Sequence, residues 1–453
     1  MRVYLILLSC ICLCACTSLN QLNNSSDPET LVSSQDIQAQ YINYTFPNYP
    51  DSALIIINLN KKETSHAVHG QLSPPQKINT ECAQLRVNDK KYLRPPQLKP
   101  HQSLRLETTP ELGSFTRFKT HSLKEGFQYP GISVLSKYVY ESKYTRIYWD
   151  TDQLEQLNHI NLDQLSQKLD LITENQFNKY GRSSDIDNNQ KIKLLFYDIA
   201  SKTDNQNTIG YFWQLDLYDE DINKYYSNQG ELLYLNTALF SGRYDNNHIY
   251  HTFSHELQHL ITFSQRRSTN SSLIAKWLDE GIAEAVSFEM VPEFSDAHHQ
   301  NNPDIHQNLA LIDNNLSFDQ YSLIYLFLSY CCAHSGNPEL FFKDLIQSPY
   351  NDHMVIEHYF KEKQSYFESF DQLLINFKIT NLIQNQDGIY CYRNPEFKLN
   401  YPLLINSNYL RTIPGTSSLY RPLSTSIWNT KYAEPISNNQ INKDIRYIRI
   451  NYE

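Results

Sequence analysis

The chain has 453 residues, of which 40% are hydrophobic and 19% are charged. This composition is typical of a folded protein, and the length exceeds what one ordinary core organises, so two or three domains are expected. The formal net charge of -10 and the lack of any long basic run argue against general nucleic-acid binding, which needs a basic surface to displace counterions from phosphates.

The first residues have the pattern of an export signal. Arg2 precedes an apolar stretch over residues 3–13, which is too short for a permanent membrane span but typical of a signal-peptide core. The letters LCAC at residues 13–16 resemble a bacterial lipobox, although a cysteine stands at its second position. We predict a lipoprotein signal peptide over residues 1–15 and lipidation of Cys16; an ordinary signal peptide is the alternative.

The segment after this signal is rich in Ser, Asn and Gln. Residues 16–40 therefore read as a flexible tether, and acyl chains on Cys16 would hold the protein on a bacterial membrane, facing the periplasm or the outside. No later segment reaches eighteen apolar residues, so no transmembrane helix is expected. An exported chain can form disulfides, but no pairing follows from the spacing of the remaining cysteines: Cys82, Cys331, Cys332 and Cys391.

The next hundred residues have the pattern of short strands. Apolar runs at residues 53–57, 84–87 and 104–106 are separated by Pro, Asn and Asp. This punctuation predicts an N-terminal β-domain over residues 41–142, with a sandwich-like arrangement.

From residue 143 the pattern changes to strands followed by helices, which is typical of an α+β domain. We expect this domain to cover residues 143–400 and a small C-terminal β-element to cover residues 401–453. The strands are expected at residues 144–149, 192–197, 210–217 and 231–236. Helical spacing is found at residues 154–180, 246–265, 273–290, 318–335 and 365–380.

The segment HELQH at residues 255–259 lies in one of these helical patterns. Residues four apart lie on the same face of a helix one turn apart, so the imidazoles of His255 and His259 can reach one tetrahedral zinc ion. Glu256 then lies beside the metal, where its carboxylate can take a proton from a water molecule.

A second helical segment, WLDEGIAE at residues 277–284, begins soon after the first. Glu280 lies twenty-one residues beyond His259 and can supply a third, oxygen ligand while a fourth position stays open, as a catalytic zinc requires. A purely structural zinc site usually closes four protein ligands, often cysteines, and none lies near this site in the sequence. There is no GxSxG motif for serine hydrolysis.

These two segments together resemble the gluzincin zinc metallopeptidases, and among them the hyicolysin family. That family has a WLNEG-x-AE element, in which Asp279 of this chain replaces the usual Asn. The resemblance covers residues 190–335 and implies a zincin-like fold, one zinc ion per chain and hydrolysis of peptide bonds. By this correspondence the metal ligands are His255, His259 and Glu280, and the catalytic base is Glu256.

The resemblance also suggests supporting residues. Glu284, one turn after Glu280, is expected to orient His255, with a solvent-facing role as the alternative. Tyr321 is the candidate that stabilises the oxyanion, with Tyr325 and Tyr330 as rivals. His251 and His248 precede His255 on the same helix and are not expected to bind the metal, because zinc contacts only two successive turns.

The sequence thus predicts a zinc-dependent endopeptidase that cleaves extracytoplasmic polypeptides. Residues 231–236 are expected to form an edge strand that holds the substrate by strand addition. The alternative is a surface lipoprotein that has lost catalysis and binds a host or envelope partner. The intact set of two His and two Glu residues favours the enzyme.

Overall fold

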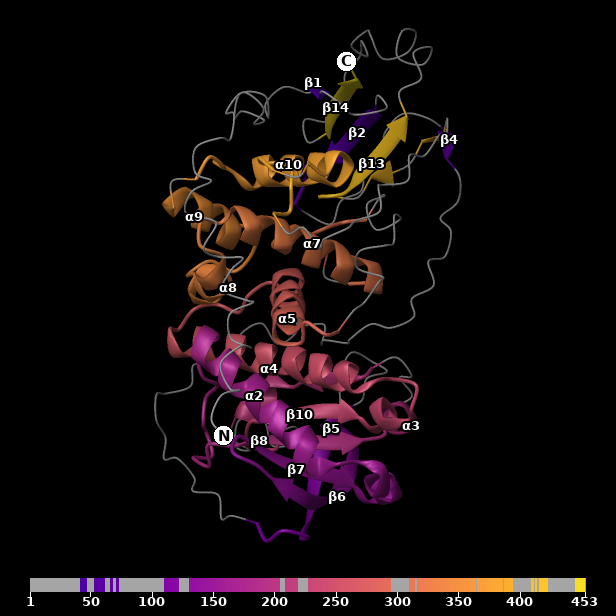
Figure 1. The fold of residues 1–453 in the computed structure, drawn as a ribbon, viewed down its shortest axis with the longest axis vertical. Helices are drawn as coiled ribbons and strands as arrows, with labels where there is room; N and C mark the ends of the chain where they lie inside the picture. Colours follow the sequence, from indigo (N-terminus) through magenta and orange to yellow (C-terminus); the bar gives the residue numbers. More distant parts are fainter. Residues whose placement is uncertain are drawn as a thin grey trace, which may run out of the picture.

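The computed structural model describes residues 41–46, 53–61, 66–67, 71–72, 110–121, 130–203, 208–218, 227–294, 309–313, 316–363, 365–385, 387–393, 409–410, 412–413, 415–422 and 445–452. These residues form an elongated stack, with one sheet at each end and helices between them (Figure 1). The predicted mixed α+β class is confirmed, because both helices and strands build the described part of the chain.

A six-stranded mixed sheet forms one end of the stack, in the order β5-β6-β7-β8-β10-β9. Strands β7, β8 and β10 run parallel, whereas β5, β6 and β9 each pair with a neighbour in the antiparallel direction. The strands are β5 (Phe115–His121), β6 (Pro130–Glu141), β7 (Thr145–Asp150), β8 (Ile192–Tyr197), β9 (Gly210–Phe212) and β10 (Leu232–Asn236).

The central strands are buried on both faces, which explains their nearly continuous apolar sequences. In β8, Leu194 and Phe196 face the core shared with the helices, whereas Leu195 and Tyr197 belong to a second cluster on the opposite face. Alternation with a period of two puts successive side chains on opposite faces, so every residue of such a strand must be compatible with burial.

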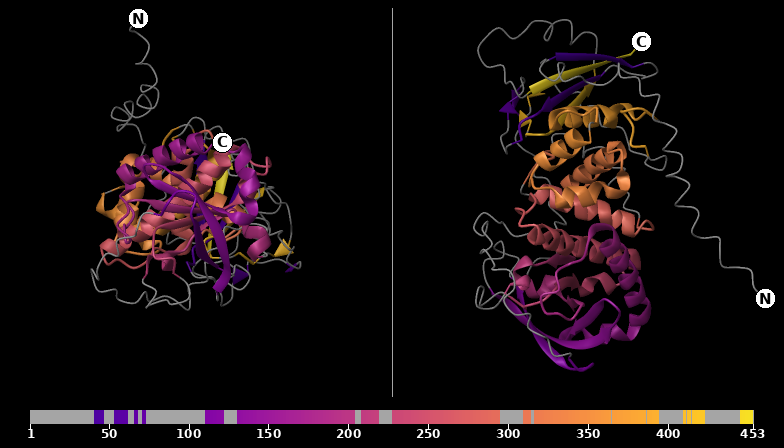
Figure 2. Two further views of the ribbon diagram at one scale, coloured as in Figure 1. Left: turned by 90° about the horizontal axis from the view of Figure 1, so that it is seen from below. Right: turned by 90° about the vertical axis from the view of Figure 1, so that its left-hand side faces the viewer.

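Two helices pack on one face of this curved sheet, as Figure 2 shows from the side: α2 (Leu162–Tyr180) and α4 (Asn246–Ser268). Asp245 caps α4, since its side chain accepts the backbone N–H of His248. The predicted helix over residues 154–180 is two elements, the 3₁₀ helix η4 (Thr151–His159) and α2. Asn161 separates them, because its side chain caps the first turn of α2.

The remaining helices fill the middle of the stack (Figure 1). Helix α5 packs between α4 and α7, and α10 contacts α7, α9 and strand β2. Their bounds are α5 (Lys276–Met290), α7 (Phe318–His334), α8 (Pro338–Gln347), α9 (Met354–Glu362) and α10 (Phe370–Ile383). Helices α8 and α9 were not predicted, and their apolar residues join the same hydrophobic core as α4 and α5.

A four-stranded sheet, in the order β1-β14-β2-β13, closes the other end and combines the two ends of the described chain. Strand β14 pairs parallel with β1 and antiparallel with β2. The bounds are β1 (Tyr41–Phe46), β2 (Ala53–Asn58), β13 (Ser418–Pro422) and β14 (Ile445–Tyr452), and short pairs join β3 (His66–Ala67) to β12 (Thr412–Ile413) and β4 (Gln71–Leu72) to β11 (Tyr409–Leu410).

This pairing differs from the predicted division of the chain. The boundary expected at residue 142 falls inside the six-stranded sheet, because β6 pairs with β7. Likewise, the strands of the predicted C-terminal β-element complete a sheet begun by β1 and β2. Apolar alternation reveals a strand but not its partner, which is why sequence reasoning grouped neighbours along the chain. The predicted strands at 84–87 and 104–106 and the signal and tether segments lie outside the described residues.

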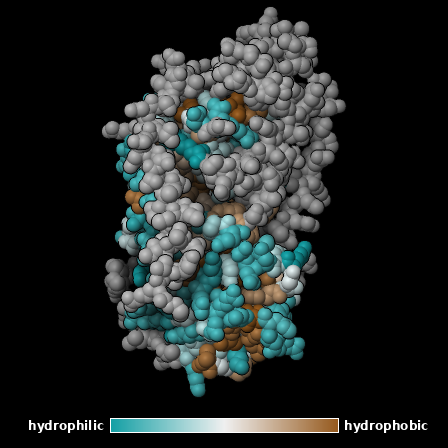
Figure 3. Space-filling view, viewed as in Figure 1, coloured by the Kyte–Doolittle hydropathy of each residue, from teal (hydrophilic) through white to brown (hydrophobic). Residues whose placement is uncertain are grey.

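The predicted strand over residues 210–217 is shorter in the structure, since β9 ends at Phe212 and the 3₁₀ helix η5 (Gln214–Leu217) follows. Among the described residues, Cys331, Cys332 and Cys391 form no disulfide. No described helix combines the length and apolar character needed to cross a membrane. Apolar surface is visible near the end of the molecule that the six-stranded sheet forms (Figure 3). Leu112, Phe115 and Ile132 are each more than half exposed.

Candidate metal centre

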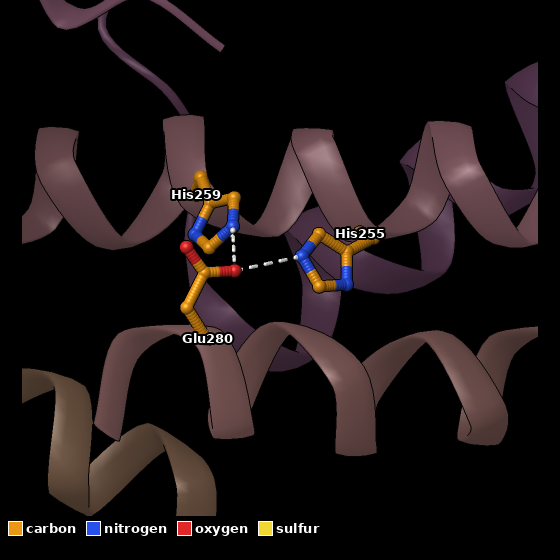
Figure 4. Close-up of side chains that lie close together, drawn as sticks. All are labelled: His255, His259 and Glu280. Atoms are coloured by element: carbon orange, nitrogen blue, oxygen red, sulfur yellow. Dashed lines mark hydrogen bonds and ion pairs between the residues drawn. The ribbon is translucent and has the colours of Figure 1, made fainter. Parts of the chain in front are cut away.

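The candidate site lies where α4 and α5 pack against each other (Figure 4). Helix α4 contributes His255, Glu256 and His259, and α5 contributes Glu280 and the acidic residues beside it. All four of these side chains are at most 2% exposed. Burying several charged and polar groups together is costly unless they face partners or ions, so their common burial indicates a specific site.

The three predicted ligands converge on one point. Oε2 of Glu280 lies 3.2 Å from Nε2 of His255 and 3.3 Å from Nε2 of His259. Figure 4 shows this single oxygen between the two imidazoles, one turn of α4 apart. The structure therefore brings together the two histidines and the glutamate that sequence spacing placed on two separate helices.

Each imidazole has a carboxylate behind it. Nδ1 of His255 lies 2.9 Å from Oε2 of Glu284, and Nδ1 of His259 lies 3.3 Å from Oδ1 of Asp279. Carboxylates in these positions hold the rings in one orientation and keep Nε2 directed toward a metal. The contact of Glu284 with His255 was predicted, whereas that of Asp279 with His259 was not, although Asp279 directly precedes Glu280 on the helix.

The charges around His255 favour a cation. Burial alone lowers the pKa of His255, but the hydrogen bonds to Glu280 and Glu284 outweigh burial and raise the pKa to about 10. The two carboxylates therefore favour a positive charge on or beside this imidazole.

The residues fit a zinc ion by chemistry and by spacing. A tetrahedral zinc with bonds of about 2.0–2.1 Å holds its ligand atoms about 3.4 Å apart, which is close to the two separations from Glu280. The ligand atoms of His255, His259 and Glu280 all lie within 4.8 Å of one another. Two imidazoles and one carboxylate leave a fourth position open, the arrangement of catalytic zinc sites.

The side chain of Glu256 lies close to the edge of the sheet. A Cβ atom placed on Gly210, the first residue of β9, would meet Cγ2 of Thr252 at 2.7 Å and Cγ of Glu256 at 3.3 Å. Only glycine allows β9 to approach α4 this closely. The end strand of the sheet and the candidate base are therefore neighbours.

Of the three candidate tyrosines, Tyr321 lies nearest the site. It is 5% exposed, its ring centre is 6.4 Å from that of His255, and it hydrogen-bonds Glu280. Burial, together with the negative charge of Glu280, raises its pKa well above the usual range, so it remains a hydroxyl donor. Tyr325 packs on Phe288, and the hydroxyl of Tyr330 donates to the carbonyl of Ile389.

The two neighbouring histidines of α4 have other partners. Nε2 of His251 lies 3.1 Å from the Ser287 hydroxyl, and its ring stacks on Phe294. Nδ1 of His248 lies 2.7 Å from the capping carboxylate of Asp245. Neither belongs to the group of residues that can hold a metal.

Gly281 explains how α5 reaches its position. A Cβ at this residue would come within 2.3 Å of Cγ2 of Ile324 and 2.7 Å of Cδ1 of Leu328, both on α7. The absence of a side chain lets α5 lie against α7 while the preceding residue, Glu280, points toward α4. Close packing of α5 against α7 therefore explains why a glycine follows the third ligand.

The chain is thus an α+β protein in which a mixed sheet is covered by helices, and two histidines and a glutamate from an HExxH helix and its neighbour form a candidate metal centre. No protein-family model matches the chain. Among curated proteins, it is 29% identical over 226 residues to the neutral metalloprotease ShpI of Staphylococcus hyicus.

This match covers 47% of the chain and 51% of that protein, so the chain spans about half the length of the curated relative. The distant similarity supports the metallopeptidase class that the sequence predicted.

Proposed function

We propose that this protein is a zinc-dependent endopeptidase of the gluzincin type, with a zincin-like domain, that cleaves extracytoplasmic polypeptides. The observation that carries the proposal is the convergence of His255, His259 and Glu280, with Oε2 of Glu280 at 3.2 and 3.3 Å from the two imidazoles. The similarity to a neutral metalloprotease over about half the chain adds support.

The residues around this point have distinct roles in the proposed reaction. When bound there, zinc acts as a Lewis acid that lowers the pKa of water and polarises a carbonyl oxygen. Glu256 takes a proton from the attacking water and delivers it to the leaving amine. Tyr321, which stays protonated, donates a hydrogen bond to the oxyanion that develops on the substrate.

The position of the substrate follows from the strand order. Strand β10 was expected to be the edge that receives the substrate, but it lies between β8 and β9 and has no free edge. In the part of the chain that the structure describes, β9 is the last strand of this sheet, and its Gly210 packs beside Glu256. We therefore assign strand addition to β9, which would bring an extended peptide next to the base.

Hydrolysis of casein tests the proposal. A soluble form that begins at Thr17 is compared with its Glu256→Gln variant in zinc-containing buffer, with bound zinc measured in both. We expect the variant to keep its zinc and to lose activity by about 10²–10⁴-fold, the usual contribution of a general base.

The other outcomes are equally informative. Equal activity in both proteins would indicate a contaminating protease, and a wild-type chain that binds no zinc would contradict the metal centre. Zinc binding without hydrolysis would favour the alternative, a surface lipoprotein that only binds a partner.

We further propose that the protein is exported and anchored to a bacterial membrane through lipid on Cys16. The support is the lipobox-like sequence at residues 13–16 and the polar segment that follows. Labelled palmitate should enter the wild-type chain and not the Cys16→Ala variant. Labelling of both would place the lipid elsewhere, and labelling of neither would favour an ordinary signal peptide.

A further inference from the structure

A second group of acidic side chains lies outside the α4–α5 centre. Asp185 and Asp187 belong to the loop between α2 and β8, and Glu231 directly precedes β10. One carboxylate oxygen from each of these three residues lies within 4.8 Å of the others. The group forms because β8 and β10 are adjacent parallel strands, with the backbone N–H of Lys193 donating to the carbonyl of Glu231 at 2.7 Å.

The loop is folded around the first of these carboxylates. Oδ1 of Asp185 accepts the backbone N–H groups of Asn189 and Gln190, each at 3.0 Å. Gln190 has a φ of 57°, in the left-handed region that favours glycine. Asp, Asp and Asn at alternate positions, followed by a left-handed sixth residue, match the first half of a calcium-binding loop.

The charges in the group do not balance. Nζ of Lys193 lies 2.8 Å from Oδ2 of Asp187, and both side chains are at most 6% exposed. Three carboxylates and one ammonium leave a formal charge of minus two, mostly in buried surroundings. A buried charge of this size needs a counter-ion or a proton.

Glu231 is the most deeply buried carboxylate of the group. It is 1% exposed, and its Oε1 accepts the backbone N–H of Ile186 at 3.0 Å. The Ser184 hydroxyl also interacts with this carboxylate, yet Oε2 has no hydrogen-bond partner among the described residues. Burial, with a smaller contribution from the charge of Asp187, raises the pKa of Glu231 to about 8. The Glu231 carboxylate is therefore buried beside those of Asp185 and Asp187, and its Oε2 accepts no hydrogen bond from the described residues.

We propose that Asp185, Asp187 and Glu231 form a second cation site, which binds calcium and fastens the loop after α2 to the start of β10. Only oxygen ligands are offered, which suits calcium rather than zinc. Carboxylates from a loop and a strand give the irregular arrangement that calcium tolerates and magnesium does not. Calcium neutralises the formal charge of minus two, and its role is to stabilise the sheet rather than to take part in hydrolysis.

Calorimetric titration with calcium chloride tests this site. The full chain in mild detergent is stripped of metal and reloaded with one equivalent of zinc, so that the α4–α5 centre is occupied before calcium is added. We expect one calcium per chain with a dissociation constant of about 10⁻⁵–10⁻³ M. Tm should rise by about 2–5 °C at a calcium concentration a hundredfold above that constant.

Three variants identify the ligands and separate the two centres. Glu231→Gln and Asp185→Asn should each weaken calcium binding at least tenfold, whereas the zinc-site variant His255→Ala/His259→Ala should bind calcium as the wild type does. Asp185 is only partly buried, so Asp185→Asn decides the question if Glu231→Gln does not fold.

Two results would overturn the proposal. The first is a wild-type chain that shows neither heat of binding nor a rise in Tm up to about 10 mM calcium, well above the range of weak extracellular sites. That result would mean that a proton on Glu231 balances the charge instead. The second is unchanged calcium binding in Asp185→Asn and Glu231→Gln, which would place the ion elsewhere. Neither result affects zinc content or hydrolysis, so the proposed function is judged separately.

Discussion

The α4–α5 centre and helix α10 both bury charged groups in the same hydrophobic core, but they surround them differently. In the centre, His255 lies between Glu280 and Glu284, so opposite charges face one another. On α10, Lys378 is fully buried, and its Nζ has no hydrogen-bond partner among the described residues. The Nζ atom lies 5.3 Å from the centre of the Phe377 ring.

This difference separates two effects of a buried charge. A charge in a group of converging partners shapes a site where a metal or a proton is held, whereas a charge in apolar surroundings chiefly lowers stability.

The contrast fails at once if the α4–α5 centre does not hold the metal. Replacing both histidines, as His255→Ala/His259→Ala, removes two of three ligands and should reduce bound zinc from one ion per chain to none, as measured by elemental analysis. Circular dichroism should still show a folded protein, because the large core around α4 remains. Retention of zinc by the folded double variant would show that the assigned site is wrong.

The carboxylates that contact Nδ1 of the two histidines should contribute less to zinc affinity than the ligands themselves. Glu284→Gln should lower zinc affinity by about 10–100-fold, because the neutral amide orients His255 less firmly. Asp279→Asn should have a smaller effect, since its contact with His259 is 3.3 Å rather than 2.9 Å. Competition with a chromophoric chelator measures both affinities. A larger loss in Asp279→Asn would reverse the assigned importance of the two contacts.

Helix α7 contacts both α5, which belongs to the α4–α5 centre, and α10, which carries Lys378. Gly281→Ala places a methyl group 2.3 Å from Cγ2 of Ile324, so it should lower the free energy of unfolding by about 1–3 kcal/mol, as overpacked cores do. Urea denaturation measures this change. In an Ile324→Ala background the added methyl has room, and the same substitution should cost less; equal costs in both backgrounds would contradict the proposed clash.

The buried lysine should give the smallest effect and a distinctive pH dependence. Burial lowers the pKa of Lys378 from 10.5 to about 7, so the folded protein favours the neutral amine. Its destabilising effect is therefore complete below pH 7 and disappears as the pH rises toward 10.5. Lys378→Met should raise the free energy of unfolding by on the order of 1 kcal/mol at pH 7.

The comparison is made by urea denaturation at pH 7 and pH 9.5. The gain from Lys378→Met should shrink at the higher pH, whereas Lys361→Met, at a lysine whose side chain is 54% exposed, should change stability little at either pH. A gain that is the same at both pH values would mean that shape rather than charge is responsible.

Much of the candidate site could be predicted because it depends on local geometry. The spacing of four between His255 and His259, and again between Glu280 and Glu284, places each pair on one helix face whatever the rest of the chain does. The two helices of the site, α4 and α5, were predicted to within a few residues of their bounds, since their apolar spacing is regular over long segments. Strand β8 was predicted with the bounds that the structure has, because a short, nearly continuous apolar run is typical of a strand that is buried on both faces.

Other features depend on contacts between distant segments. Asp279 contacts His259 only because α5 packs at a particular height along α4, and Asp185 approaches Glu231 only because β8 and β10 are neighbours in the sheet. The alternation of Asp185, Asp187 and Asn189 was visible in the sequence, but the third carboxylate lies more than forty residues further along the chain.

Helical periodicity is set by the backbone within a few residues, so the local sequence dictates which helices carry the ligand residues and which faces they share. Contacts between distant segments were needed to bring one oxygen of Glu280 to both imidazoles, to make β9 rather than β10 the described edge, and to join β1 and β2 to β13 and β14 in one sheet. These outcomes follow from the packing of a common hydrophobic core and from strand pairing, which join residues without regard to their separation along the chain.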